Sequence, residues 1–118
     1  MEMDPRQLGK AGEDLAARVL KQQGYKILER NYRTPLGEID LVARHQGDLV
    51  FIEVRTRRSL RFGTPLESLS FAKQQRLRRL AEYYVKRRKL PPTAMRLDVV
   101  AIIWDAAGPQ VEIIQGAL

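Results

Sequence analysis

Two acidic residues and one arginine stand in segments that should form buried strands, and their types suggest metal-dependent chemistry on a phosphate. Residues 37–43 and 49–55 are mostly apolar, yet the first segment contains Asp40 and the second contains Glu53. Desolvating a carboxylate is costly unless a cation or a metal ion compensates it. Because alternate residues of a strand share a face, Glu53 and Arg55 lie on the same face of the second segment. These residues predict a metal site that acts on a phosphate group.

The two acids belong to neighbouring strands if residues 45–48, with the sequence His-Gln-Gly-Asp, close a hairpin. Mg²⁺ prefers oxygen ligands and is usually held by one or two carboxylates together with substrate phosphate. We therefore expect Mg²⁺ or Mn²⁺ at Asp40 and Glu53. Glu13, on the edge of a helix that contains Gly9, is expected to add an outer ligand or to orient a water molecule. Arg55 would stabilise the negative charge of the transition state.

A purely structural interpretation of the same acids stays open. Asp40 and Glu53 could pair with Arg55, Arg57 or Lys73, and ion-pair networks of this kind resemble active sites. Such a network would satisfy both carboxylates without any metal or substrate.

Three other polar residues are weaker candidates. Glu38 shares a face with Asp40, but its place at the start of a strand predicts exposure to solvent. Asp98 interrupts an apolar strand, and Arg96 offers it a simple ion pair. His45 falls in the hairpin turn and is expected to be exposed, which argues against histidine chemistry.

The elements that must position these residues have clear local signals. Asp4, Pro5 and Gln7 start a first helix that Gly24 ends, and Ser70 caps a second helix that runs to about residue 89. Strands are expected over residues 25–32, 38–44, 49–55, 95–104 and 110–115. This order predicts a single α/β domain over residues 1–118, with a mixed sheet flanked by helices.

Apolar residues at helical spacing predict the buried face of each helix. In the first helix the expected stripe consists of Leu8, Leu15, Ala16, Val19 and Leu20, and in the second it consists of Leu77, Leu80, Ala81 and Tyr84. Gly9 and Gly12 lower the helix propensity of the first helix. They predict that this helix lies close against another element.

The charge of the chain favours a polyanionic partner. The formal net charge is +7 and the sequence contains no cysteine. A strongly basic balance is typical of nucleic-acid binding, so we expect DNA as the partner. The residues expected to contact its backbone are Arg57, Arg58 and Arg61 in the loop after Glu53, and Lys73, Gln75 and Arg76 on the second helix. No signal peptide and no apolar stretch long enough for a bilayer are seen, so we expect a cytoplasmic protein without a membrane partner.

Asp40 followed by Glu53-Val54-Arg55 on the next strand resembles the active-site motif of the PD-(D/E)XK, restriction-endonuclease-like nucleases. Gly9, Gly12-Glu13 and Ala16 resemble the first helix of the Holliday-junction-resolvase-like branch, in which a glutamate joins the metal site. Across nearly its full length the chain is similar to the YraN-like family of small bacterial proteins. The stretches that carry this similarity are residues 37–41, 51–57, 62–65 and 96–100.

The resemblance implies an αβββαβ(β) core, a metal-dependent nuclease activity on DNA, and supporting polar residues at Lys73 and Gln75. Because resolvase-like relatives often dimerise, it also suggests a homodimer. The chain departs from the superfamily at Arg55, where the motif has a lysine. Arginine holds its proton under all physiological conditions, so Arg55 is suited to bind phosphate or stabilise charge but not to act as a general base.

Three hypotheses follow. The first is a nuclease that is structure-selective or nonspecific, because few residues look suited to reading base edges. The second is a nucleic-acid-binding module that keeps the fold and has lost catalysis, which Arg55 favours. The third is a scaffold that binds an acidic protein partner through its basic surface.

Overall fold

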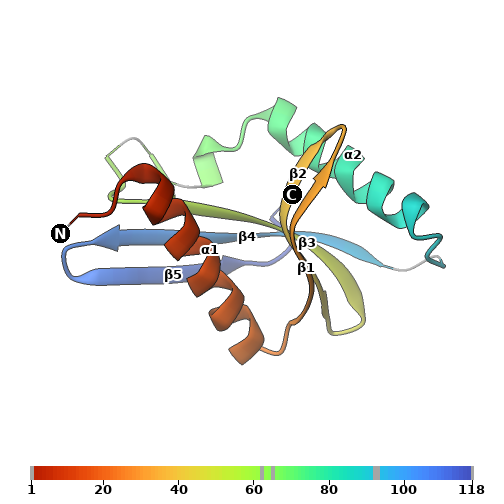
Figure 1. Ribbon diagram of the computed structural model, residues 1–118, viewed down its shortest axis with the longest axis horizontal. Helices are drawn as coiled ribbons and strands as arrows, with labels where there is room; N and C mark the ends of the chain where they lie inside the picture. The colour runs from red at the N-terminus through yellow and green to blue at the C-terminus, as the bar shows by residue number, and fades with distance from the viewer. Residues whose placement is uncertain (1, 62, 65, 92–93, 118) are drawn as a thin grey trace.

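The computed structural model describes residues 2–61, 63–64, 66–91 and 94–117. Phe62 and Pro65, which belong to the stretches of family resemblance, lie outside the described residues. The elements, in chain order, are α1 (Pro5–Gln22), β1 (Lys26–Thr34), β2 (Gly37–His45), β3 (Asp48–Arg57), the 3₁₀ turn η1 (Leu66–Ser68), α2 (Phe71–Arg87), β4 (Met95–Asp105) and β5 (Gly108–Ile114) (Figure 1).

Within the described residues, five strands form one sheet in the order β1-β2-β3-β4-β5. Neighbouring strands are antiparallel except for β3 and β4, which are parallel. Parallel neighbours need a crossover connection, and α2 supplies it. The predicted mixed α/β fold is confirmed, and its arrangement is compatible with a restriction-endonuclease-like core.

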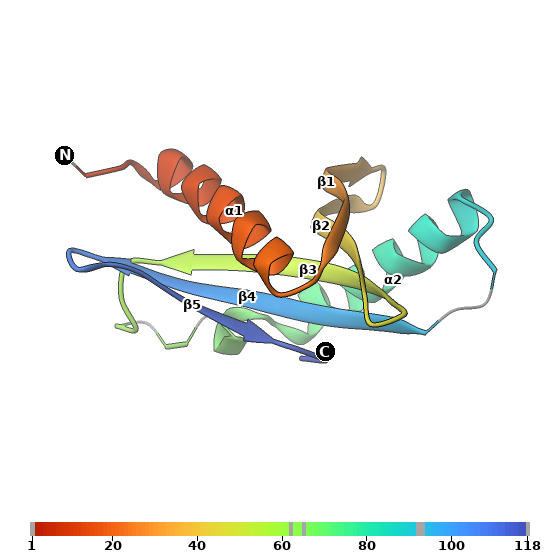
Figure 2. The same ribbon diagram turned by 90° about the horizontal axis from the view of Figure 1, so that it is seen from below.

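The two helices cover opposite faces of the sheet, and each face has its own apolar core (Figure 2). On the α1 face, Ala16, Ala17 and Leu20 pack with Leu41, Ala43, Val50, Ile52, Val100 and Ile102. On the α2 face, Leu77, Leu80, Ala81 and Tyr84 pack with Ile39, Val42, Leu49, Phe51 and Leu97. The strand β3 is apolar on both faces because it is buried between these two layers. Neither α1 nor α2, the α-helices of the described residues, is long and apolar enough to cross a lipid bilayer.

The local signals at the start and end of α1 act as expected. Oδ1 of Asp4 accepts a hydrogen bond from the backbone N–H of Gln7 at 2.8 Å, and Oε1 of Gln7 accepts one from the N–H of Asp4 at 2.9 Å. Gly24 follows the helix with a φ of +90°, which a glycine adopts without strain. The buried stripe is shifted from the predicted one: Ala17 and Gly12 are buried, whereas Leu15 and Val19 are only half-buried.

The second helix also follows its sequence signals. Oγ of Ser70 accepts a hydrogen bond from the N–H of Lys73 at 3.2 Å, which confirms the predicted cap. The helix ends at Arg87 rather than near residue 89. Its buried residues are those predicted: Leu77, Leu80, Ala81 and Tyr84.

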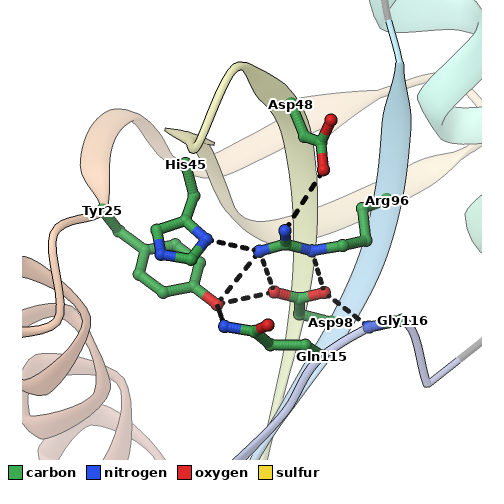
Figure 3. Close-up of polar contacts among 7 residues, drawn as sticks. All are labelled: Tyr25, His45, Asp48, Arg96, Asp98, Gln115 and Gly116. Atoms are coloured by element: carbon green, nitrogen blue, oxygen red, sulfur yellow. Dashed lines mark hydrogen bonds and ion pairs between the residues drawn. The ribbon is translucent and has the colours of Figure 1, made fainter.

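A buried polar network joins the start of β4 to three other segments (Figure 3). The Asp98 carboxylate, fully buried, accepts two hydrogen bonds of 2.9 Å from the Arg96 guanidinium and one of 2.8 Å from the Tyr25 hydroxyl. It also accepts the backbone N–H of Gly116 at 2.9 Å. The expected ion pair between Arg96 and Asp98 is confirmed, and it is one part of this larger network.

The expectation that His45 is exposed was wrong. Its side chain is only 6% exposed, and its ring stacks on that of Tyr25 with a centroid separation of 3.9 Å. Nδ1 of His45 lies 2.8 Å from a guanidinium nitrogen of Arg96. Because the guanidinium can only donate, Nδ1 accepts this hydrogen bond. Tyr25, between α1 and β1, and Arg96, on β4, cover the ring.

The strand β2 leaves β3 partway along its length. Their pairing runs from His45 opposite Asp48 to Leu41 opposite Ile52 and stops there, whereas β1 stays paired with β2 up to Gly37. The far half of the β1–β2 hairpin therefore rises away from the plane of β3 and β4 (Figure 2). Asp40 is the first residue beyond the last β2–β3 pair, so the divergence opens the sheet at this acid.

Only one of the two helical glycines is explained by close packing. A Cβ placed on Gly12 would lie 3.0 Å from the Cβ of Thr56 on β3 and nearer still to its Oγ1. At Gly9 no atom lies within 4 Å of such a Cβ, so the predicted close approach of this helix is made at Gly12 and not at Gly9. Gly12 sets the distance between α1 and the end of β3, where Arg55 is placed.

We expect Gly12→Ala to lower the free energy of unfolding by about 1–3 kcal/mol, because the added methyl group overpacks the contact with Thr56. Gly9→Ala is the matched control and should raise it by about 0.5–1 kcal/mol through helix propensity. Urea unfolding of both variants measures the difference. A Gly12→Ala variant as stable as Gly9→Ala would contradict the close approach of α1 to β3.

Candidate active site

The carboxyl groups of Asp40 and Glu53 meet where β2 diverges from β3. Oδ2 of Asp40 accepts a hydrogen bond from the backbone N–H of Val54 at 2.8 Å. A continuing β2 strand would supply a backbone partner along this stretch of β3, and the Asp40 side chain takes that place. This bond brings the carboxyl group to the side chain of Glu53, and the two acids interact directly.

Both acids open into one cavity of about 240 Å³ between the diverging hairpin and the start of α2. Three cationic side chains share its wall with them. The lining consists of Glu38, Asp40, Glu53, Arg55, Leu69, Lys73, Arg76 and Leu77. The predicted convergence of Asp40, Glu53 and Arg55 is therefore seen in the structure.

Arg55 is a largely buried cation of this cavity and forms an ion pair with Glu53. Its Nε lies 3.4 Å from Oε1 of Glu53, and the two side chains are only 13% and 19% exposed. Nε of Arg55 is buried and makes no hydrogen bond with any of the described residues. Buried polar nitrogens are nearly always hydrogen-bonded, so this one is a donor with unused capacity beside two acids.

Ionisation of both acids at the same time is unfavourable, because the two buried carboxylates would repel each other. Burial, followed by the neighbouring Glu53 carboxylate, raises the pKa of Asp40 from 3.8 to about 7. Burial also raises the pKa of Glu53, although the positive charges of Arg55, Lys73 and Arg76 oppose that shift. Burial and the repulsion between the two carboxylates thus favour a pair that keeps a proton near neutral pH.

Glu13 lies in an adjoining cavity of about 300 Å³, which also has Arg55 in its wall. Burial raises the pKa of Glu13, and the carboxylates of Asp40 and Glu38 add to the effect. The Asn31 amide stands between the two outer acids. With its nitrogen turned toward them, it donates to Glu38 at 2.9 Å and to Glu13 at 3.2 Å.

Among the described residues, no three histidine or acidic side chains gather closely enough to hold a metal ion by themselves. Asp40 and Glu53 are brought together, and Glu13 stays in the neighbouring cavity. Two carboxylates that repel one another form a donor set of hard oxygens. Such a set fits Mg²⁺ or Mn²⁺, which accept one or two carboxylates plus oxygens from substrate and water.

The predicted nucleic-acid contacts separate into two groups. Lys73 and Arg76, on α2, line the cavity of the two acids. Gln75 is half-buried and is not part of that lining.

None of the three predicted arginines is part of this lining, and Arg57, the last residue of β3, lines the neighbouring cavity of Glu13 instead. Arg57 donates to Oγ of Ser68 at 3.3 Å and so ties the end of β3 to η1. Arg58 donates instead to the backbone carbonyl of Met3, before α1. Arg61 is exposed in the loop.

Sequence reasoning missed Asn31 and Leu69 and gave Glu38 too little weight. Glu38 is exposed, as predicted, yet it is one of the residues that line the cavity. Asn31 has a φ of +51°, a value at which asparagine is enriched, but nothing in the sequence ties it to Glu13. Its place depends on the pairing of β1 with β2, which brings residue 31 beside the acids.

Residues 12–102 match the uncharacterised protein family UPF0102. The chain belongs to this family. A UPF0102 protein of Moorella thermoacetica is 54% identical over 121 residues, which cover 99% of both chains. UPF0102 proteins of Caldicellulosiruptor saccharolyticus and Rhodococcus opacus are 44% and 46% identical over 111 residues each. These alignments cover 94% and 93% of this chain, and 94% of each relative. The family name states no reaction, so any reaction has to be inferred from the geometry of the site.

The raised pKa of Asp40 predicts how stability changes with pH. The unfolded chain loses this proton near pH 4 and the folded chain near pH 7, so folding stability falls as the pH rises through that window. Asp40→Asn keeps an acceptor for Val54 and removes the charge. It should raise the free energy of unfolding above pH 7 by on the order of 3 kcal/mol and flatten the slope between pH 4 and 7.

Urea unfolding between pH 5 and 8 tests this prediction, with Asp14→Asn as the control. The hydrogen bond from Arg30 dominates the pKa of Asp14 and lowers it. Loss of the Asp14 carboxylate should therefore destabilise the fold at neutral pH, in contrast to loss of the Asp40 carboxylate. A native chain that becomes more stable from pH 5 to 7, with a parallel curve for Asp40→Asn, would contradict the assignment of the proton.

Proposed function

We propose that this protein hydrolyses phosphodiester bonds in DNA with the help of a divalent cation, Mg²⁺ or Mn²⁺. The observation that carries the proposal is the shared cavity in which Asp40 and Glu53 face the cations Arg55, Lys73 and Arg76. A cavity lined only by acidic side chains would bind a cation, and one lined only by basic side chains would bind an anion. Both together suit a phosphate bound through a metal ion.

The fold supports this proposal by analogy. The order of helix, three strands, helix and two strands resembles the PD-(D/E)XK nuclease core, and Asp40, Glu53 and Arg55 resemble its motif in the sequence. A shared fold does not establish a function, so the geometry of the side chains has to carry the argument.

Asp40 and Glu53 would hold the cation, and its positive charge would allow both carboxyl groups to ionise at neutral pH. When bound, such an ion polarises a phosphoryl oxygen and neutralises negative charge as the phosphorus is attacked. Glu13 sits one cavity away with a raised pKa, so it is suited to hold a proton or a water molecule at the edge of the site.

The cationic residues bind and orient the substrate in this proposal. The buried Nε of Arg55 lies 3.4 Å from Oε1 of Glu53 and has no hydrogen-bond partner among the described residues, so it could donate a charge-assisted hydrogen bond to a phosphate oxygen. Lys73 and Arg76 lie one turn apart on the same side of α2, so they can contact the phosphates on either side of the reacting one. All these groups recognise the backbone rather than base edges, so we infer cleavage that is nonspecific or selective for DNA structure.

We expect the native chain to cleave DNA with Mn²⁺ or Mg²⁺ and to lose this activity when EDTA removes the metal. Asp40→Asn and Glu53→Gln should each reduce the rate by about 100-fold or more, because both remove charge that stabilises the bound ion. Cleavage of labelled duplex, single-stranded and branched oligonucleotides measures these rates.

Glu112→Gln, an exposed substitution on the edge strand β5, is the matched control and should leave the rate unchanged. Unfolding cannot explain a loss in Asp40→Asn, because that variant is expected to be more stable than the native chain. Activity that survives both acid substitutions would come from a contaminant and would overturn the proposal.

A second candidate function is a nucleic-acid-binding module without catalysis. Two observations favour it: Arg55 replaces the lysine of the motif, and Asp40 has a structural role in bonding to the N–H of Val54. Salt-dependent DNA binding without cleavage by the native chain would support this candidate.

Substitution of Arg55 separates the two candidates. If Arg55 acts through charge alone, Arg55→Lys should retain cleavage, and Arg55→Met should lose about 100-fold of the rate. The same oligonucleotide assay measures both variants. A native chain that binds but does not cleave, together with an active Arg55→Lys variant, would identify the protein as the silent module.

A further inference from the structure

The tip of the β1–β2 hairpin is made of two apolar residues that point into solvent. Pro35 and Leu36 connect the paired residues Thr34 and Gly37, and both are exposed. The Leu36 side chain is 48% exposed. Tight hairpin loops are usually built from Asn, Asp and Gly, so an exposed leucine at this position has no role in forming the turn.

The tip is held in one conformation. Oγ1 of Thr34 accepts a hydrogen bond from the N–H of Leu36 at 3.0 Å and donates one to the carbonyl of Gly37 at 3.0 Å. The ring of Pro35 restricts its own φ. Gly37 has a φ of +136°, which only glycine adopts readily. Leu36 is therefore presented on a stiff support rather than on a loose loop.

This tip stands beside the candidate active site. Two residues after Leu36, Glu38 lines the cavity that holds Asp40 and Glu53. A Cβ placed on Gly37 would lie 3.6 Å from Cδ of Arg76, another residue of that cavity. Figure 1 shows the end of the hairpin next to α2. A ligand larger than the cavity would thus lie close to the tip.

Two arginines and one glutamate, Arg33, Arg76 and Glu38, lie beside the tip and leave it with an excess of positive charge. The Arg33 side chain, three residues from Leu36, is 83% exposed and lies 3.4 Å from Glu38. Arg76 is exposed on the α2 side. Since Arg33 is paired with Glu38, Arg76 beside Gly37 supplies the excess positive charge. An exposed apolar side chain next to such a charge complements a partner with an anionic backbone and flat apolar groups behind it, and DNA has this combination.

We propose that Leu36 is an apolar wedge that packs against nucleobases next to the bound phosphate and selects DNA at steps where base stacking is already interrupted. This inference rests on the proposed function. Leucine side chains can insert between base steps, and they do so at a cost in unstacking. That cost is smallest where a duplex ends or opens, so the wedge favours such a site over the middle of a closed duplex.

The test uses the full chain and an oligonucleotide duplex with a single-stranded extension, in EDTA so that no cleavage occurs. One copy carries the fluorescent base 2-aminopurine at the junction, and a second copy carries it in the middle of a closed duplex. The native chain should raise the junction fluorescence and leave the central probe unchanged. Leu36→Ser should remove this rise and weaken binding of the junction DNA by about tenfold.

Leu28→Ser is the matched control, because Leu28 is an exposed leucine, 37% accessible, on the same hairpin but far from its tip along the strand. It should behave like the native chain. Leu36→Phe should keep the fluorescence rise, because an aromatic ring can also pack on a base.

The possible results separate the inference from the proposed function. Native binding of all DNAs without any junction signal, or an unchanged signal in Leu36→Ser, would overturn the wedge and leave the proposed function standing. Absence of salt-sensitive binding to any DNA, in EDTA and with Mg²⁺ alike, would overturn both. Loss of self-association in Leu36→Ser, with DNA binding unaltered, would assign the tip to a second copy of the chain and overturn the wedge.

Discussion

The hydrogen bond from the Val54 N–H to the Asp40 carboxyl group is the interaction on which the site depends. It lies where β2 ends its pairing with β3, and it satisfies a strand donor that would otherwise lose its partner. The same bond holds Asp40 beside Glu53. One side chain therefore permits the sheet to open and places the first acid of the site at the opening.

The opening also decides what surrounds the acids. As the hairpin rises, the start of α2 closes the gap from the other side, and Lys73 and Arg76 reach the same cavity. Their positive charges oppose the rise that burial causes in the pKa of Glu53. Two partly desolvated carboxylates that repel each other lie beside an arginine nitrogen without a hydrogen-bond partner among the described residues. The packing of the two apolar cores holds these groups in place despite the cost. Strain of this kind is often concentrated at functional sites, where the rest of the fold compensates for it.

At the opposite end of the central strands, near the start of β3 and β4, the buried polar groups form a hydrogen-bonded network. There Asp98 accepts four hydrogen bonds, and Arg96 joins it to Asp48, His45 and Tyr25 (Figure 3). This network links β4 with the β2–β3 hairpin, with the turn after α1 and with the residues after β5. A buried carboxylate and guanidinium are tolerated here because almost every donor and acceptor is paired. Fixed at this end, β2 and β3 are free to diverge only at the other.

Much of the fold could be predicted from local signals in the sequence. The capping residues Asp4 and Ser70 placed both helices, and the apolar spacing along α2 named all of its buried residues. The proximity of Asp40 to Glu53 also followed from short-range information, because a tight hairpin must bring its two strands together. These features depend on interactions between residues a few positions apart, and such interactions favour the same local structure in almost any protein.

Other features depend on contacts between distant segments, and the sequence could not supply them. An unbroken strand would put Ile39 and Val42 on opposite faces, yet both pack against α2 because β2 bends between them. His45 is buried by Tyr25 and Arg96, which are far from it in the chain. Glu13 lies in a neighbouring cavity because the contact of Gly12 with Thr56 sets where α1 crosses β3.

Residue types and their spacing thus determined which groups could do chemistry and which strands would carry them. Only the tertiary structure decided which of these groups share a cavity, since the cavity is formed by the divergence of a hairpin and the approach of a helix. Local propensities act over a few residues, whereas distances between acids and cations are set by the packing of whole elements.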